Sequence, residues 1–135
     1  MAIPKNLQHK PIIAVDNYDK IDGHYVPNTD ARALSIGEAQ YGKNEISAKV
    51  LRHTGKNWSR QSEELPIHRT LDLAILIVAS MLPPSTDEKS VSQSLGEKIV
   101  DPDKYQILKD YYTAHDYILK PRLEELKDLL NTLIP

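Results

Sequence analysis

The residues best suited to binding a ligand lie close together between positions 49 and 60. Four side chains in this segment of twelve residues are positively charged and none is acidic: Lys49, Arg52, Lys56 and Arg60. His53 and Trp58 lie between them. Cations next to aromatic rings are the combination that binds phosphate and stacks on bases. The segment therefore predicts either an anion site, in which Arg60 holds the anion and Trp58 covers an apolar part, or a solvated strand end and loop.

Histidines and carboxylates offer a second kind of chemistry. His53, His68 and Asp16 are candidate catalytic residues, in which a histidine acts as general base and Asp16 or Glu64 orients it. No nucleophile elbow, P-loop or dinucleotide-binding motif accompanies them. Whether the protein is an enzyme therefore stays open.

A metal site is the third possibility. Glu64, His68 and Asp72 are spaced four residues apart, so one helix would carry all three on one face. Arg69 lies three residues before Asp72 and offers it an ordinary ion pair. We expect a satisfied polar patch here, with no metal and no cofactor.

The candidate ligand-binding residues are polar or aromatic groups at the ends of the expected elements. They are Asp16, Asn17, Asp30, Arg52, His53, Trp58, Arg60, Gln61, Glu64 and His68.

Two strands and a short helix are expected to position these residues. Residues 11–15 form a continuous apolar run, which predicts a strand buried on both faces. Residues 28–30 are three good capping residues, so a short helix is expected over 31–40. Alternating side chains predict a half-buried strand over 46–53. The two strands pair either through a parallel crossover, which the short loops favour, or antiparallel.

Helices are expected in the rest of the chain. Residues 65–82 are apolar nearly all round and predict a buried central helix. Residues 83–100 read as a mobile linker or a weak helix within a single domain that spans residues 1–135. Asp101 followed by Pro102 is a strong start signal for a further helix. Helical pattern continues over 115–133, with Pro121 as a kink or a fresh start.

The last helix carries an apolar seam at alternating spacings of four and three residues. Its members are Leu119, Leu123, Leu126, Leu130 and Leu133. This is the spacing of a left-handed helix pair. The seam packs either on the helix at 65–82 or on a second copy of the chain in a homodimer.

Composition gives the fold class and excludes several functions. The chain has 135 residues, no Cys, 17 basic and 19 acidic side chains and 27% charged residues. These values are typical of one globular domain, here of the α+β class: a small sheet with a short helix, followed by the central helix and one or two C-terminal helices. A net charge of −2 argues against nucleic acid as a partner. No apolar run reaches the ~20 residues of a membrane span, and a cytoplasmic location is the default.

Part of the chain resembles an uncharacterised family of small prokaryotic proteins of unknown function. The residues that carry the resemblance lie within 11–82: Val15–Tyr18, Asn28–Ser35, Arg52–Gly55, Trp58–Glu64, His68–Arg69 and Leu71–Leu73. The resemblance implies no activity, ligand or catalytic residue.

Three functions follow as alternatives. The first is a small cytoplasmic domain that binds a ligand, such as a small anion, or a protein partner, in a polar pocket at the start of the central helix. The second is a small enzyme with a histidine–carboxylate pair. The third is a purely structural assembly protein.

Overall fold

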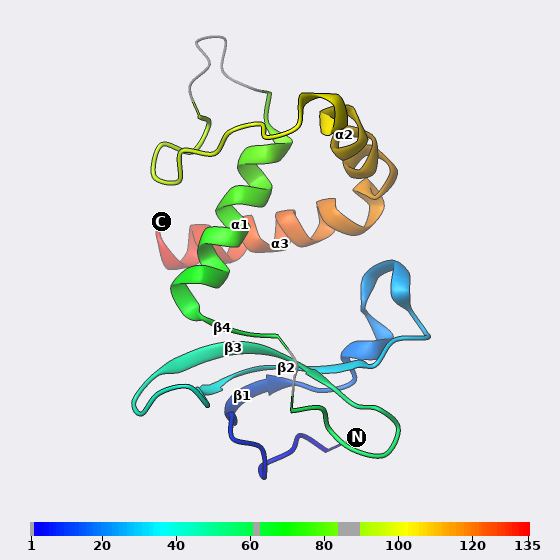
Figure 1. The fold of residues 1–135 in the computed structure, drawn as a ribbon, viewed down its shortest axis with the longest axis vertical. Coiled ribbons are helices and arrows are strands. Elements are labelled where there is room, and N and C mark those ends of the chain that lie inside the picture. The colour runs from blue at the N-terminus through cyan, green and yellow to red at the C-terminus, as the bar shows by residue number, and fades with distance from the viewer. Residues whose placement is uncertain (1, 61–62, 84–89) are drawn as a thin grey trace. The chain divides into compact units, whose positions relative to one another are not determined.

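The computed structural model describes residues 2–60, 63–83 and 90–135. It divides into two compact units, residues 1–74 and residues 75–135, which are taken one at a time below. Strands come first along the chain and helices follow, as Figure 1 shows. The predicted α+β class is confirmed.

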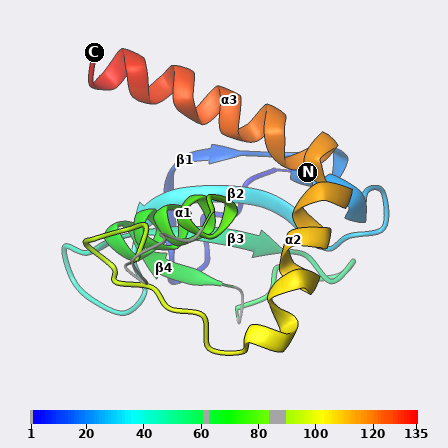
Figure 2. The ribbon, with the colours of Figure 1, turned by 90° about the horizontal axis from the view of Figure 1, so that it is seen from above.

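The first unit contains a sheet of four strands. These are β1 (Lys10–Val15), β2 (Ala31–Glu38), β3 (Ile46–Arg52) and β4 (Glu64–Pro66). They lie side by side in chain order, and every neighbouring pair is antiparallel (Figure 2). The two strands predicted at 11–15 and 46–53 are β1 and β3, and they do not pair with each other because β2 lies between them. The parallel crossover and the direct antiparallel pair are therefore both wrong.

The segment 31–40 is a strand rather than the predicted short helix. β2 pairs with β1 over Leu34–Glu38 on one side and with β3 over Ala31–Glu38 on the other. The Thr29 hydroxyl accepts a hydrogen bond from Ala31 N at 3.2 Å. A side-chain to backbone bond of this kind is what the capping residues at 28–30 predicted. This hydrogen bond closes a turn before a strand instead of beginning a helix. The backbone groups of the residues that follow bond to the neighbouring strands rather than within a helix.

One face of the sheet is buried, and its side chains are small or polar. Along β2 every second residue from Ala31 to Gly37 has the lower exposure. Ser47, Lys49 and Leu51 are the buried residues of β3. Leu7 from the N-terminal segment joins Ala33 and Leu51 to form the core, against which Ile3 and Trp58 pack. The alternation predicted for 46–53 is confirmed.

β1 is an edge strand, which corrects the expectation of a strand buried on both faces. Among the described strands it pairs only with β2. Ile12 and Ile13 remain 67% and 65% exposed. Continuous apolarity over five residues does not distinguish an edge strand from a central one.

The helix α1 (Ile67–Met81) matches the predicted bounds of 65–82 closely. It is not buried as predicted. Ala79 is its one buried residue, while Leu71 is 60% exposed and Ile75 is 42% exposed.

The second unit contains α2 (Tyr105–Ala114) and α3 (Asp116–Leu133), which follow a single turn at Pro102–Lys104. Asp101 begins this turn as predicted, since its carboxylate accepts a hydrogen bond from Asp103 N at 3.1 Å. α3 continues through Pro121. Residues 90–100 contain turns and bends without a helix, and 84–89 of the predicted linker lie outside the described residues. Within the described ranges, no helix is both long and apolar enough to span a bilayer.

Candidate functional site

A short hairpin loop after β3 brings together several of the predicted ligand-binding residues. His53 and Trp58 form an isolated antiparallel bridge across it. Thr54 N donates to Asn57 O at 2.9 Å, and Gly55 has a φ of +98° that suits glycine. The loop is therefore held in shape by its own backbone bonds.

Trp58 serves both packing and pocket formation. Its indole packs against the core of the first unit. It also meets the ring of His53 edge-on, with centroids 5.1 Å apart and an interplanar angle of 85°. A T-shaped pair of this kind fixes both rings.

One ring nitrogen of His53 is fixed as an acceptor by the loop backbone. Its Nδ1 atom accepts a hydrogen bond from Gly55 N at 3.0 Å. Because Nδ1 accepts, the ring proton of the neutral tautomer lies on Nε2. No carboxylate of the described residues holds His53, so the histidine–carboxylate pair of the enzyme alternative is not formed here.

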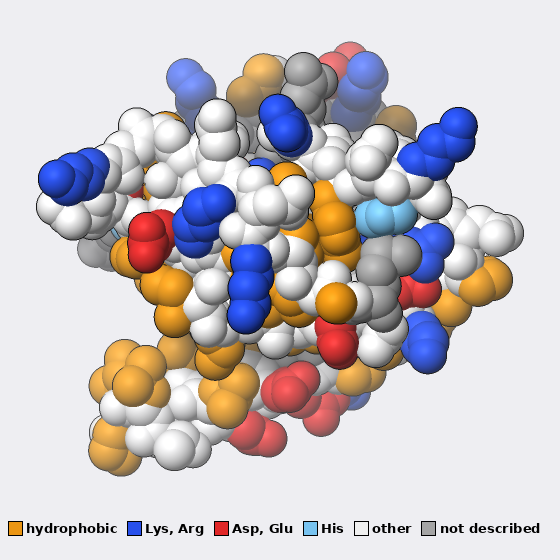
Figure 3. All heavy atoms as spheres, turned by 90° about the horizontal axis from the view of Figure 1, so that it is seen from below, with side chains coloured by type: hydrophobic (Ala, Val, Ile, Leu, Met, Phe, Trp, Pro, Cys, Tyr) orange, Lys and Arg blue, Asp and Glu red, His pale blue; other side chains and the backbone are white. Residues whose placement is uncertain are grey.

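A hollow of about 470 Å³ lies beside this loop. Polar, aromatic and cationic side chains line it, with one leucine: Asn6, Leu7, His53, Lys56, Asn57, Trp58 and Arg60. No carboxylate is among these lining residues. Lys and Arg side chains are spread over the face drawn in Figure 3, and a histidine side chain lies near some of them. We call this hollow the loop pocket.

The two cations of the loop pocket are not engaged elsewhere. Lys56 and Arg60 make no ion pair or side-chain hydrogen bond to any other residue that the structure describes. Both are exposed. An anion in the hollow would meet two cationic side chains that have no ion-pair partner among the described residues.

Arg52, also a predicted ligand residue, is occupied by carboxylates of its own unit. Its guanidinium donates to Glu63 through Nε at 3.1 Å and through Nη2 at 2.7 Å, and to Asp30 through Nη1 at 2.5 Å. The Glu63 and Asp30 hydrogen bonds raise the pKa of Arg52, and Arg52 in turn lowers the pKa of Glu63. The single guanidinium is shared by the two carboxylates, so Arg52 is already engaged and the three groups together keep one net negative charge. Asp30 precedes β2 and does not begin a helix.

The other predicted residues lie apart from the loop pocket. Asp16 and Asn17 follow β1, where the Asn17 amide donates to the Asp16 carboxylate at 3.3 Å. Asn17 has a φ of 55°, which starts a 3-10 turn. His68 lies exposed in the first turn of α1. Gln61 lies outside the described residues. Of the predicted ligand-binding residues, His53, Trp58 and Arg60 line the loop pocket.

Sequence reasoning missed a buried polar cluster around His9. His9 Nε2 lies 2.8 Å from Ser35 Oγ, and its Nδ1 lies 3.1 Å from Glu64 Oε1. Ser47 Oγ lies 3.0 Å from Nδ1 and donates to the same carboxylate oxygen at 2.6 Å. With Nδ1 protonated and Nε2 accepting from Ser35, a neutral His9 is fully bonded.

Glu64 belongs to this cluster and not to a metal-binding helix face. It lies in β4, before α1 begins, so Glu64, His68 and Asp72 do not share one helical face. Burial raises the pKa of Glu64, but hydrogen bonds from Ser47, Gln40 N and His9 outweigh burial and lower it. No cluster of three metal-ligating side chains occurs in the described part of the chain.

A serine hydroxyl and a carboxylate contact opposite ring nitrogens of one histidine, here Ser35, Glu64 and His9, and this is the arrangement of a hydrolase triad. Here the three groups are sealed: His9 is 0% exposed, Ser35 4%, and the Glu64 side chain 3%. A substrate cannot reach Ser35 Oγ, so the cluster acts as a buried polar tie between the N-terminal segment and three strands. Only long-range contacts reveal it, because its hydrogen-bonded pairs are 17 to 55 residues apart in the sequence.

Comparison with known proteins finds no curated protein and no solved structure that matches the chain. A family model does match, and it covers residues 1–89. The match contains the whole stretch over which the sequence resembles an uncharacterised family, and it leaves out α2 and α3. The chain is therefore a member of DUF6530, a family of unknown function.

Proposed function

We propose that this protein is a small anion-binding domain whose site is the loop pocket. The observation that carries the proposal is the pair of cations, Lys56 and Arg60, that line a hollow without carboxylates and have no ionic partner among the described residues. Uncompensated cations that converge on a hollow favour an anion by direct charge pairing.

The chemistry of the lining defines the class of ligand. Arg60 matches the two oxygens of a phosphate or carboxylate group bidentately. The His53 N–H and the Asn57 amide offer neutral donors beside it. Trp58 offers an apolar ring edge for the rest of the molecule. A small phosphate- or carboxylate-bearing metabolite fits this set, and a cytoplasmic location agrees with the lack of cysteine.

A thermal-shift titration tests the proposal, with inorganic phosphate and citrate as probes at constant ionic strength. Binding at a hundred times Kd raises the free energy of unfolding by about 2.7 kcal/mol. Arg60→Ala changes the stability of the unliganded protein by less than ~0.5 kcal/mol, because Arg60 is exposed. It removes the anion-dependent rise in melting temperature.

Lys43→Ala is the matched control. Lys43 is an exposed cation of the same unit, in the turn before β3 and outside the pocket lining. Its variant keeps the full response. An equal response from Arg60→Ala and Lys43→Ala would show that any stabilisation arises from general charge screening, and it would remove the proposal.

A further inference from the structure

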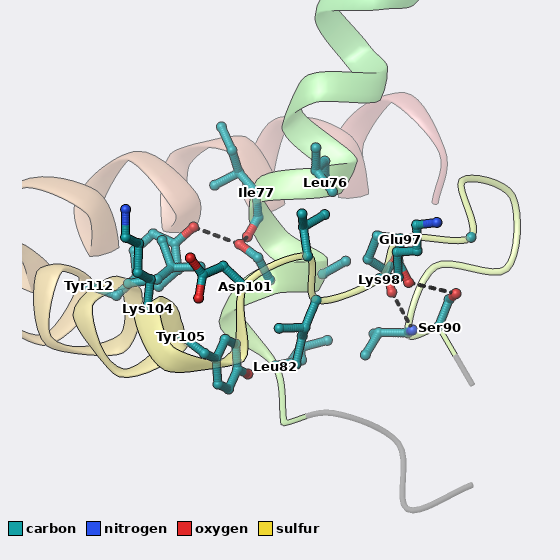
Figure 4. Close-up of a pocket in the computed structure, with 17 residues that line it drawn as sticks. Leu76, Ile77, Leu82, Ser90, Glu97, Lys98, Asp101, Lys104, Tyr105 and Tyr112 are labelled. Carbon is teal, nitrogen blue, oxygen red and sulfur yellow. Dashed lines mark hydrogen bonds between the residues drawn. The ribbon is translucent and has the colours of Figure 1, made fainter. Parts of the chain in front are cut away.

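A second cavity lies within residues 75–135 and differs in chemistry from the loop pocket. It has a volume of about 890 Å³ and is bounded by α1, the segment 90–101 and α2, as Figure 4 shows. Its wall is mainly apolar, and the larger apolar residues include Leu76, Ile77, Leu82, Ile99, Tyr105 and Leu108. This volume lies within the range of pockets that enclose small molecules. We call it the helical cleft.

The apolar wall is open to solvent as it stands. Ile77, Leu82 and Ile99 are 47%, 49% and 48% exposed. A contiguous set of apolar side chains left this open is unfavourable in water and marks a binding surface.

The polar groups of the wall mostly satisfy one another. The Ser80 hydroxyl donates its hydrogen bond to Ile77 O, so at the Ser80 Oγ–Tyr112 OH contact of 2.6 Å the Tyr112 hydroxyl is the donor. Glu97 accepts from the backbone N–H groups of Val91 and Ser92 at 2.7 and 2.9 Å. The wall therefore presents few free acceptors to a ligand.

Two lysines are the exception. Lys98 and Lys104 line the helical cleft on opposite sides of the view in Figure 4. The ammonium group of neither lysine makes a hydrogen bond or an ion pair with any residue in the described part of the chain. The two acidic residues of the lining, Glu97 and Asp101, are both held by backbone N–H groups.

We infer that the helical cleft binds a small amphipathic anion, an acyl chain with a terminal carboxylate. The chain covers the exposed apolar wall, and the carboxylate pairs with Lys98 or Lys104. The lysine side chains favour an anionic over a cationic amphiphile, because neither ammonium group has an ion-pair partner among the described residues, whereas both carboxylates of the lining accept backbone hydrogen bonds. This inference is independent of the loop pocket, since the two sites share no residue.

Calorimetric titration of the full chain with octanoate, decanoate and dodecanoate, all below micelle-forming concentrations, tests the apolar half of the inference. Each added methylene group that enters the cleft strengthens binding roughly fourfold. If the affinity of the Arg60→Ala variant depends on chain length in the same way, the fatty acids do not bind in the loop pocket. An affinity that does not change with chain length would overturn the inference.

The charged half is tested with the double variant Lys98→Ala/Lys104→Ala. Decanoate binding weakens at least tenfold, while decanol binds the variant and the wild type equally. Lys127→Ala, which removes an exposed lysine of α3 outside the lining, leaves decanoate binding unchanged. Wild-type protein that binds decanol as tightly as decanoate, or a double variant that loses nothing, contradicts the role of the lysines.

A third variant keeps the site assignment falsifiable. Leu108→Glu places a carboxylate on the wall at a position that is 36% exposed, so the fold is retained, as circular dichroism checks. Decanoate binding is lost in this variant if the inference is right. A folded Leu108→Glu protein that binds decanoate with wild-type affinity overturns the inference. Sedimentation of the wild-type protein with phosphatidylglycerol vesicles is a separate check. Wild-type protein that sediments with the vesicles but does not bind free decanoate also overturns the inference.

Discussion

The imidazole of His53 stands edge-on to the indole of Trp58, with the ring centroids 5.1 Å apart. These two residues face each other across the hairpin loop that follows β3, and Ser59 N returns to Arg52 O at 2.7 Å. The loop pocket is thus preformed by backbone bonds and one ring contact. Of its cations, Lys56 lies within this hydrogen-bonded loop and Arg60 directly follows it, so the backbone around Lys56 is already held before an anion binds.

Gly37 marks a close approach between β1 and β2. A Cβ atom added there would overlap the carbonyl group of Lys10 and lie 2.8 Å from Pro11 Cα. Gly37→Ala therefore lowers the free energy of unfolding by about 1–3 kcal/mol, because backbone atoms have to move. Urea unfolding measures the loss.

Gly42→Ala is its control. The added Cβ at Gly42 meets only the flexible Glu45 side chain, at 2.9 Å from its Cγ. We expect a change below ~0.5 kcal/mol. Equal losses for the two variants would mean that β1 does not pack on Gly37 as described.

The buried Glu64 makes stability depend on pH. The pKa of Glu64 in the folded protein is lowered from its ordinary value of 4.5, because hydrogen bonds outweigh burial. Its contribution to stability is therefore complete above pH 4.5 and is lost as the pH falls through the lower folded pKa. In Glu64→Gln, the decline of unfolding free energy below pH 4.5 is shallower, and stability at pH 7 is lower by about 1–3 kcal/mol. Parallel curves for the two proteins would refute this assignment.

The exposure of α1 predicts a small effect for a core-like substitution. Ile75→Ala lowers stability by about 1 kcal/mol, since Ile75 is 42% exposed. Leu51→Ala, at a position with 0% exposure, lowers it by roughly 2–5 kcal/mol. If Ile75→Ala lowered the free energy of unfolding by 2 kcal/mol or more, α1 would be buried in solution as the sequence predicts.

The leucine seam of α3 supports a homodimer as a proposal. Leu126, Leu130 and Leu133 are 40%, 46% and 77% exposed. We expect light scattering to give a dimer for the wild type and a folded monomer for Leu126→Asp. Asn131→Asp adds the same charge beside the seam and stays dimeric. A monomeric wild type at high concentration ends the proposal.

Sequence patterns identified β3, α1 and the helices after Asp101, because each has clear periodicity or a strong start signal. They failed for β2. The alternation in Ala31–Glu38 is one of side-chain size, with Ala31, Ala33, Ser35 and Gly37 on the buried face. The hydrophobicity of the side chains does not alternate along this segment, although their size does. The apolar residues alone therefore do not show the two-residue period of a strand, and the segment was predicted as a helix.

The site was partly predictable for a related reason. His53, Trp58 and Arg60 are local in sequence, and the loop that joins them is short. His9 was not predictable, because its partners Ser35, Ser47 and Glu64 come from three different strands. Only the register of the sheet brings them to one point.

The most direct test of the anion site uses the single tryptophan of the chain. In a ¹⁵N-labelled sample, Trp58 gives one indole N–H resonance, which reports on the loop pocket. Titration with inorganic phosphate at constant ionic strength is predicted to shift this resonance and the amides of residues 53–60 with a single saturable Kd, and to shift neither in Arg60→Ala. Resonances over 53–60 that stay unmoved at saturating phosphate, or that move equally in Arg60→Ala, would contradict the account.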